Sequence, residues 1–394
     1  MPDFLSQAQD LFEYTRELRR DFHRHPEMGF QEVRTAGIVA KELHNLGLEV
    51  STGIAETGVV ALIHGKHKGP VVLLRFDMDA LPIEEQTGTE YASQTSGVMH
   101  ACGHDGHTAI GLTAARMLHA YQDQLVGTVK LVFQPAEEGL GGAERMVAEG
   151  VLEKPRPDYS LALHLWNGKP LGWFGITPGP VMAASETFAI RITGKGGHGA
   201  VPHQAVDPVL AAAQIVNALQ SIVSRNVNPL ESAVVSVTSI HGGSTFNVIP
   251  PYVDLQGTIR SFVPEVRALI LERIEKTTTM IAQSLECDAE IEIDDITPAV
   301  VNSPAVTERV QSTAAELFPD APLMTEYQTM GSEDMAFMMG DIPGCFFFIG
   351  SADSSRALDA PHHHPKFDFD EAALVNAAAL ITSAAVDLLS NPPK

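Results

Sequence analysis

Apolar and polar residues follow two rhythms along the first 165 residues, one typical of helices and one typical of strands. Apolar residues recur at helical spacing from Phe4 to Leu18, and a second helical pattern over 31–46 ends at Gly47. The remaining elements predicted here are strands at Val59–Ile63, Val71–Phe76, Thr128–Phe133 and Tyr159–Leu165, and helices near 107–120 and 142–149. Strands that alternate with helices predict an α/β sheet covered by helices on both faces.

The rhythm changes between about residues 184 and 297. The predicted elements are the strand Glu186–Thr193, the helix Asp207–Ser224, the strands Ser232–Ile240 and Tyr252–Phe262, the helix Pro264–Leu285 and the strand Ala289–Ile296. This β-α-β-β-α-β order is the ferredoxin-like pattern. After residue 303 the α/β rhythm resumes with a helix, the apolar strand Cys345–Ile349 and a final helix after Asp370.

These rhythms predict two domains. Residues 1–183 and 298–394 form a discontinuous α/β domain with a mixed sheet, and residues 184–297 form a smaller ferredoxin-like α+β domain inserted into it. The junctions Pro178–Ala184 and Thr297–Pro304 are rich in proline, glycine and small residues, which is typical of hinges.

Charge and composition narrow the class of protein. The 394 residues include 26 Lys and Arg against 49 Asp and Glu, a formal net charge of −23. So acidic a surface repels phosphates, so we expect neither a nucleic acid nor an anionic membrane as partner. The sequence has no run of 18 apolar residues, and acidic residues interrupt its N-terminal segment. Three cysteines do not make a disulfide scaffold, so we expect a cytoplasmic protein.

Candidate metal ligands gather where predicted strands end. Cys102 and His104 lie in a Gly-containing loop before a helix, where a thiolate and an imidazole can reach one metal or two adjacent metals. Glu137 and Glu138 directly follow a strand, so one carboxylate can bind metal while the other acts as general acid and base. Taken alone, the first pair is more typical of a helix-capping loop and the second of a solvated turn.

Histidines add to this inventory. His164 ends an otherwise apolar strand, and three consecutive histidines, 362–364, stand before a proline in a loop that precedes the last helix. A lone histidine at a strand end is usually a core or rim residue. Combined with the thiol and the glutamate pair, however, these imidazoles make a set of ligands for a two-metal hydrolytic centre.

Ten ordered motifs extend over nearly the whole chain. They are DFHRHPEMGFQE (21–32), RFDMDALPI (75–83), MHACGHDGHT (99–108), FQPAEEG (133–139), HLWN (164–167), GKGGHGAVPH (194–203), FNVIP (246–250), GTIRSF (257–262), GSEDM (331–335) and HHPKFDFDE (363–371). With these motifs the chain resembles the M20 metallopeptidase family, in the branch of aminoacylases, hippurate hydrolases and carboxypeptidases that act on N-acyl amino acids.

The resemblance implies a dinuclear metal centre. The implied ligands are Cys102, His104, Glu138, His164 and one histidine of the last motif. The family pattern His-x-Pro/Ser-x-Phe-x-x-x-Glu fits His363, while His362 and His364 are neighbours that sit out of register. Cys102 takes the place of the bridging aspartate of other branches. A thiolate favours a soft or borderline ion such as Zn²⁺, and Mn²⁺, Co²⁺ and Ni²⁺ stay open.

The resemblance also implies roles in catalysis. Glu137 is the expected general base, and Asp79 is expected to orient a ligand imidazole. From the inserted domain, His198 is expected to stabilise the oxyanion, and Asn247 and Arg260 to hold a substrate carboxylate. The implied reaction is hydrolysis of an N-acyl amino acid, a dipeptide or a related small amide. The inserted domain is the expected lid and dimerisation domain of a homodimer or higher oligomer, with lid residues able to serve the partner's site.

Two other functions are compatible with part of this pattern. Cys102 could be the nucleophile of a cysteine hydrolase with a nearby histidine as base, but Glu137 and Glu138 would then have no task. A metal-binding protein of the same fold without catalysis would lack a general base, whereas Glu137 is present. Sensitivity to a chelator separates the first alternative from a metallohydrolase, and a turnover assay separates the second.

Overall fold

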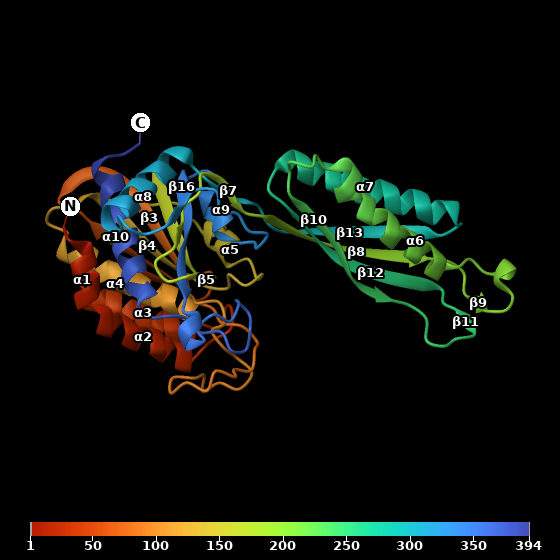
Figure 1. Ribbon diagram of the computed structural model, residues 1–394, viewed down its shortest axis with the longest axis horizontal. Coiled ribbons are helices and arrows are strands. Elements are labelled where there is room, and N and C mark those ends of the chain that lie inside the picture. The colour runs from red at the N-terminus through yellow and green to blue at the C-terminus, as the bar shows by residue number, and fades with distance from the viewer. Residues whose placement is uncertain (1, 394) are drawn as a thin grey trace. The chain divides into compact units, whose positions relative to one another are not determined.

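The computed structural model describes residues 2–393, and the chain divides into two compact units. Unit 1 comprises Met1–Val181, Val300–Gln328 and Asp334–Lys394, and unit 2 comprises Met182–Ala299 and Thr329–Glu333. Figure 1 labels their helices and strands. Each unit has its own hydrophobic core, so each is described by itself.

Unit 1 is organised around an eight-stranded sheet (Figure 1). In the sheet order its strands are β1 (Glu49–Ile54), β2 (Gly58–His64), β4 (Val126–Gln134), β3 (His67–Asp77), β5 (Tyr159–Pro170), β16 (Gly344–Ala352), β6 (Phe174–Gly175) and β15 (Leu323–Met324). β3 runs parallel to β4 and β5, and β5 runs parallel to β16. β2 is antiparallel to β1 and β4. The sheet is therefore mixed, as predicted. A separate two-stranded sheet pairs β7 (Gly179–Met182) with β14 (Val300–Asn302).

Helices pack on this sheet. They are α1 (Phe4–Asp10), α2 (Phe12–Arg24), α3 (Val33–Asn45), α4 (His104–Ala120), α5 (Gly142–Ala148), α8 (Pro304–Leu317), α9 (Met335–Met339) and α10 (Ala373–Ser390), with a 3-10 turn η3 (Ser354–Arg356). α10 packs on β3, β5 and β16 and contacts α4 and α8. α5 and α9 contact each other and touch β4 and β5, respectively.

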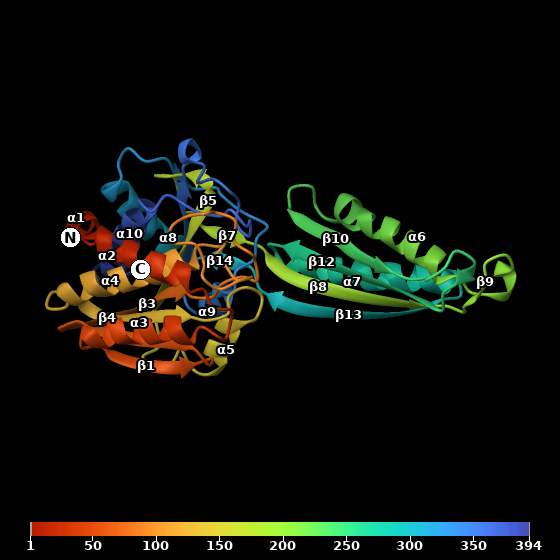
Figure 2. The ribbon, with the colours of Figure 1, turned by 90° about the horizontal axis from the view of Figure 1, so that it is seen from below.

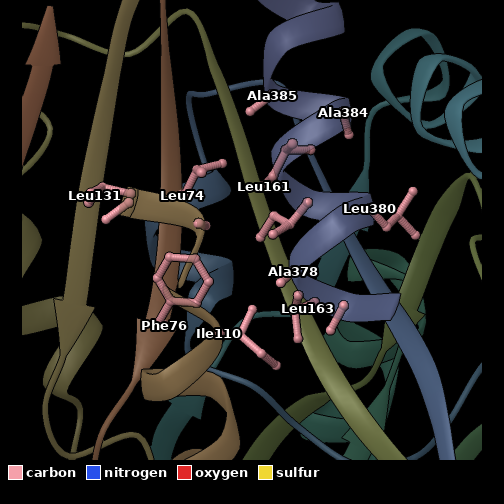
Figure 3. Packing of buried hydrophobic residues seen from close by; sticks show 14 of the residues in the cluster. Leu74, Phe76, Ile110, Leu131, Leu161, Leu163, Ala378, Leu380, Ala384 and Ala385 are labelled. Carbon is pink, nitrogen blue, oxygen red and sulfur yellow. The ribbon is translucent and has the colours of Figure 1, made fainter. Parts of the chain in front are cut away.

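The alternation of β5 decides where its polar residues point. Leu161, Leu163 and Leu165 are buried in the same core as the small residues of α10, and Figure 3 shows the first two beside that helix. Successive side chains of a strand point to opposite faces. His164 therefore points to the face of the sheet opposite α10. It was predicted to end its strand, but β5 continues to Pro170, so His164 lies near the middle of the strand.

α10 is long and apolar enough to cross a membrane by length and composition alone. Its mean hydropathy is 1.6, but 83% of it is buried inside the protein. Burial of this kind is expected of a core helix, and Figure 3 shows its Ala378, Ala384 and Ala385 in the packed interior.

Unit 2 contains a four-stranded antiparallel sheet with the order β10-β12-β8-β13. Its elements are β8 (Ala184–Thr193), β9 (Gly197–His198), η1 (Pro202–Gln204), α6 (Pro208–Ser221), the π-helical turn η2 (Ile222–Asn226), β10 (Ala233–His241), β11 (Val248–Ile249), β12 (Tyr252–Ser261), α7 (Pro264–Ser284) and β13 (Asp288–Thr297). α6 and α7 pack along one face (Figures 1 and 2). Chain order and sheet order together are those of a ferredoxin-like fold.

Some element boundaries differ from the prediction. The first predicted helix is two helices, α1 and α2, with Leu11 between them. The helix expected from about His107 begins at His104, because Gly103 adopts a left-handed φ of 94° that starts the helix there. β1 was not predicted, since its residues are mostly exposed and show little apolar alternation.

Candidate metal centre

The candidate ligands come from segments that follow neighbouring strands. Cys102 and His104 stand at the start of α4, which comes after β3, and Glu137 and Glu138 follow β4. His164 belongs to β5, and His363 lies in the loop between β16 and α10. Because β3, β4, β5 and β16 are parallel neighbours, their carboxyl ends meet at one edge of the sheet.

The side chains meet at that edge in overlapping groups. Three groups made only of predicted ligands and Glu137 have all their ligand atoms within 4.8 Å of one another: Cys102 with His104 and His164, Cys102 with Glu138 and His363, and His104 with Glu137 and Glu138. The Cys102 Sγ lies 3.5 Å from the His164 Nε2, and the His363 Nε2 lies 3.3 Å from a Glu138 oxygen. Cys102 is thus shared by two groups of donors.

Hydrogen bonds set the tautomers of two histidines. The Nδ1 of His104 lies 3.0 Å from the carbonyl of Asp79, and the Nδ1 of His164 lies 2.7 Å from the carbonyl of Leu165. A carbonyl only accepts, so Nδ1 carries a proton in both rings and Nε2 is the nitrogen that can bind a metal. The His104 Nε2 is buried and makes no hydrogen bond with any described residue. A buried ring nitrogen without a hydrogen bond, beside a thiol and two carboxylates, fits a metal ion.

Asp79 supports both sides of the cluster. One of its carboxylate oxygens lies 3.2 Å from the His104 Nδ1, and the other accepts the backbone N–H of Glu138 at 3.0 Å. The side chain is buried. Asp79 is therefore placed to hold a candidate ligand ring and the glutamate loop at once.

The electrostatics of the cluster are those of a site short of positive charge. Burial raises the pKa of the Cys102 thiol well above its ordinary value, and the carboxylates of Glu138 and Glu137 raise it further. Burial alone would lower the pKa of His104, but Asp77 and Asp79 outweigh it and raise that pKa to about 10. In both shifts the neighbouring carboxylates raise the pKa, and a divalent cation would balance their negative charge.

The three consecutive histidines have different surroundings. His363 reaches Glu138, as described above. His362 is mostly buried, lies 4.7 Å from the Trp166 ring between centroids, and bonds through Nε2 to the Leu165 carbonyl at 3.0 Å. The His364 side chain is exposed and its Nδ1 accepts the N–H of Lys366 at 3.1 Å. Of the three, only His363 belongs to a group of candidate ligands among the described residues.

Asp77 and His107 form a hydrogen-bonded pair next to the candidate ligands, which the sequence analysis did not predict. The His107 Nε2 accepts the backbone N–H of Leu165 at 2.9 Å, so its Nδ1–H donates to Asp77 at 2.7 Å. Arg75, also buried, donates to the other oxygen of Asp77 at 2.6 Å. These hydrogen bonds hold the backbone of β5 at Leu165, the residue next to His164. The only signal in the sequence was that the segments of Asp77 and His107 flank those of the expected ligands.

The expected substrate-binding residues lie in unit 2. His198 is exposed in β9, which pairs with β11, and its Nδ1 accepts the N–H of Ala200 at 3.0 Å. Asn247 is beside it, since its carbonyl accepts the N–H of Gly199 at 2.8 Å. The structure thus brings His198 and Asn247 together.

Arg260 lies in β12 of the four-stranded sheet, whereas β9 and β11 form a separate two-stranded sheet. Its partner in the register is Ser185 of β8, whereas β9 follows the far end of β8 at Thr193 (Figure 1). Eight residue steps at about 3.3 Å separate those two positions by roughly 26 Å. Arg260 itself donates to its neighbouring carbonyl of Ile259 at 2.8 Å. Within unit 2 it therefore lies far from His198 and Asn247.

A mixed α/β sheet whose strand ends gather thiol, imidazole and carboxylate donors is the architecture of a metallohydrolase. The profile of peptidase family M20/M25/M40 matches residues 73–387. The chain therefore belongs to this family of hydrolases, which confirms the resemblance inferred from its motifs.

Similar proteins support this family assignment. The chain is 40% identical over 380 residues to an N-acetyl-L-cysteine deacetylase of Bacillus subtilis (strain 168), covering 95% of this chain and 88% of that protein. It is 37% identical over 371 residues, 93% of each chain, to thermostable carboxypeptidase 1 of Saccharolobus solfataricus. The crystal structure of the Bacillus subtilis YXEP protein, a dinuclear metal-binding peptidase of the M20 family, has a TM-score of 0.85 and 35% identity and covers 97% of this chain and 99% of its own.

Proposed function

We propose that this protein is a metal-dependent hydrolase that cleaves the amide bond of N-acyl amino acids, dipeptides or related small amides with a free carboxylate. The observation that carries the proposal is the pair of donor groups that share Cys102. The two relatives just described are named for a deacetylation of an N-acyl amino acid and for a carboxypeptidase activity, which are both hydrolyses of such amides.

The donor groups suggest how two divalent ions would be held. His104 and His164 from one donor group, Glu138 and His363 from another, and Cys102, which belongs to both groups, would hold the two ions. Thiolate, imidazole and carboxylate donors suit Zn²⁺, Mn²⁺, Co²⁺ or Ni²⁺. Bound metals of this kind supply Lewis acidity, which makes water more acidic and polarises an amide carbonyl.

Glu137 is the proposed general base. Its carboxylate belongs to the donor group with His104 and Glu138, and one of its oxygens lies 4.0 Å from the His104 Nε2. Its side chain is 10% exposed, so it borders solvent together with Glu138 and His363, whereas Cys102, His104 and His164 are buried. Glu137 would accept a proton from the attacking water and deliver it to the amide nitrogen as the carbon–nitrogen bond breaks.

His198, Asn247 and Arg260 are the proposed substrate-binding residues of unit 2. Arg260 carries a planar fork suited to a carboxylate, and His198 can donate to an oxyanion. A small amide cannot span the roughly 26 Å that separates the two ends of the sheet. We therefore propose that one subunit supplies Arg260 to a site and its partner supplies His198 and Asn247.

Exposed apolar side chains on unit 2 support a homodimer. Val209 and Leu210 of α6 are 46% and 50% exposed, Val248 of β11 is 51% exposed and Phe246 is 99% exposed. Large apolar side chains exposed in this way are typical of a surface that another chain covers. Phe246 and Val248 flank Asn247 in the sequence, which agrees with the proposed shared site.

The proposal is tested by turnover of N-acetyl and N-benzoyl amino acids by metal-loaded protein. Wild type should release the free amino acid. Glu137→Gln should keep both metals but lose about 10²- to 10⁴-fold in kcat, because the amide is nearly isosteric yet cannot carry the proton. Near-full kcat in this variant with metal bound would remove Glu137 from the mechanism.

A further inference from the structure

The loop that carries Glu137 is anchored on both sides by buried carboxylates. The backbone N–H of Glu138 donates to Asp79 at 3.0 Å, and the backbone N–H of Ala136 donates to Glu32 at 2.9 Å. Glu137 thus stands between two main-chain groups that are each held by an acceptor from another segment. Asp79 has an expected role in the metal centre, whereas nothing in the proposed chemistry uses Glu32.

Glu32 lies in the protein interior, next to the loop that carries Glu137. Its residue is fully buried, immediately before α3, and its second oxygen accepts the hydroxyl of Thr57 at 2.6 Å. Backbone at Gly29 also packs on the loop, since a Cβ there would come within 3.0 Å of the Ala136 backbone. The backbone of Ala80 donates to the Glu27 carbonyl at 2.8 Å. Segment 27–32 therefore lies against both the Asp79 and the Glu137 loops.

Ala136 needs this support because its backbone is strained. Its φ is 55°, in the left-handed region that costs a residue with a Cβ about 1–2 kcal/mol. Its carbonyl accepts the N–H of Gly142 at 3.0 Å, so both main-chain groups of Ala136 are bonded in this conformation. Such a conformation persists only where the surroundings determine it. The direction in which Glu137 leaves the loop is set at this residue.

We propose that Glu32 is a positioning residue for the general base: its carboxyl oxygen holds Ala136 in the left-handed conformation that aims the Glu137 carboxylate into the active site. The inference rests on the proposed function of Glu137. The family profile matches from residue 73 onward, so Glu32 lies outside the matched segment.

An accepting oxygen, and not the negative charge, is what this role requires. Burial raises the pKa of Glu32 to about 7, although the hydrogen bonds from Thr57 and Ala136 act in the opposite direction. The carboxyl still offers its carbonyl oxygen to Ala136 when it is protonated. Glutamine, which keeps that oxygen and the shape of the side chain, should therefore replace Glu32 in this role.

The matched control is Glu27, a neighbouring carboxylate with a purely structural pair of bonds. It accepts the backbone N–H groups of Arg34 and Thr35 at 2.9 and 2.8 Å, which caps α3, and neither of these bonds involves the 135–139 loop. Glu27→Ala should lower the stability of the protein but leave the kcat of the folded enzyme unchanged.

The test compares four variants in kcat, KM and metal content. Glu32→Ala and the shorter Glu32→Asp, which keeps the charge but cannot reach Ala136, should lose at least about 10-fold in kcat with KM and two metals per chain retained, because a misplacement of about 1 Å can cost 10²-fold. Glu32→Gln should stay within about 3-fold of wild type, as should Glu27→Ala.

A second readout is independent of activity. In metal-free protein, backbone amide hydrogen exchange of the peptide over 134–140 should be faster in Glu32→Ala and Glu32→Asp than in wild type, and unchanged in Glu32→Gln and Glu27→Ala. The proposal is overturned if Glu32→Asp keeps full kcat, if it loses metal instead, or if Glu27→Ala loses kcat equally. Failure of the proposed function shows differently, as an inactive wild type or an active Glu137→Gln.

Discussion

Three consecutive histidines, 362–364, have three different environments, so alanine at each position has its own expected result. His363 is the member that reaches a second candidate ligand, with its Nε2 3.3 Å from Glu138. Structural zinc sites bind with about 10–16 kcal/mol, so one of four ligands contributes about 3 kcal/mol. His363→Ala should therefore weaken one metal by roughly 10²-fold without unfolding the protein.

His362→Ala should instead lower stability. The ring lies 4.7 Å from Trp166 and 5.2 Å from Phe367 between centroids and bonds to the Leu165 carbonyl. Removal of a buried aromatic ring leaves a cavity, which costs about 2–4 kcal/mol, while the Leu165 carbonyl keeps its hydrogen bond from His164. His364 is exposed and bonds only within its own turn, so His364→Ala should change stability by less than about 0.5 kcal/mol.

The assay is metal content by elemental analysis after desalting, followed by urea unfolding of metal-free protein. The expected pattern is metal loss with near-normal unfolding for His363→Ala, early unfolding for His362→Ala, and neither for His364→Ala. If His364→Ala loses the metal while His363→Ala keeps both ions, the assignment of the last ligand is wrong by one residue.

Three further predictions follow from the same geometry. Cys102→Ser should weaken metal binding, because an alcohol is rarely ionised at pH 7 while a metal-bound thiol is deprotonated; loss of activity with unchanged metal content would favour a cysteine nucleophile instead. Burial raises the pKa of Glu32 from 4.5 to about 7, so between these pH values folded wild type keeps a proton on Glu32 that the unfolded chain has lost. Wild type therefore loses at most about 3 kcal/mol of stability as pH rises through this range. Glu32→Gln cannot ionise, and its stability relative to wild type should rise over that range in urea unfolding; a constant difference would contradict this. Finally, a heterodimer of His198→Ala and Glu137→Gln chains, each inactive alone, should regain activity in one of its two sites, whereas full activity at a light-scattering mass of one chain would exclude a shared site.

Elements with a strong local pattern were predictable from the sequence. The four long strands and two long helices of unit 2, and the strands that precede the candidate ligands, have clear apolar and polar positions. Proline at the first position with Asp207 as cap marks the start of α6. β1 could not be predicted in this way, because its exposed residues show no apolar face and its place is set by pairing with β2.

Part of the candidate site was likewise predictable from the sequence, and part was not. Cys102, His104, Glu137 and Glu138 were visible because chemically active residues followed apolar strands. The choice of His363 needed the family pattern, since three equal residues in a row carry no register of their own. His107 and Glu32 accept backbone N–H groups of distant segments, and Asp77 bonds to the His107 ring; such contacts leave no spacing in the sequence.

Metal dependence of turnover tests the central claim most directly. The protein is treated with a chelator, desalted, and assayed on an N-acyl amino acid while Zn²⁺, Mn²⁺, Co²⁺ or Ni²⁺ is added stepwise. We predict that activity disappears on chelation and returns with at least one of these ions, reaching its maximum at two ions per chain. Full activity that persists in the chelator would contradict the account and point to Cys102 as a nucleophile.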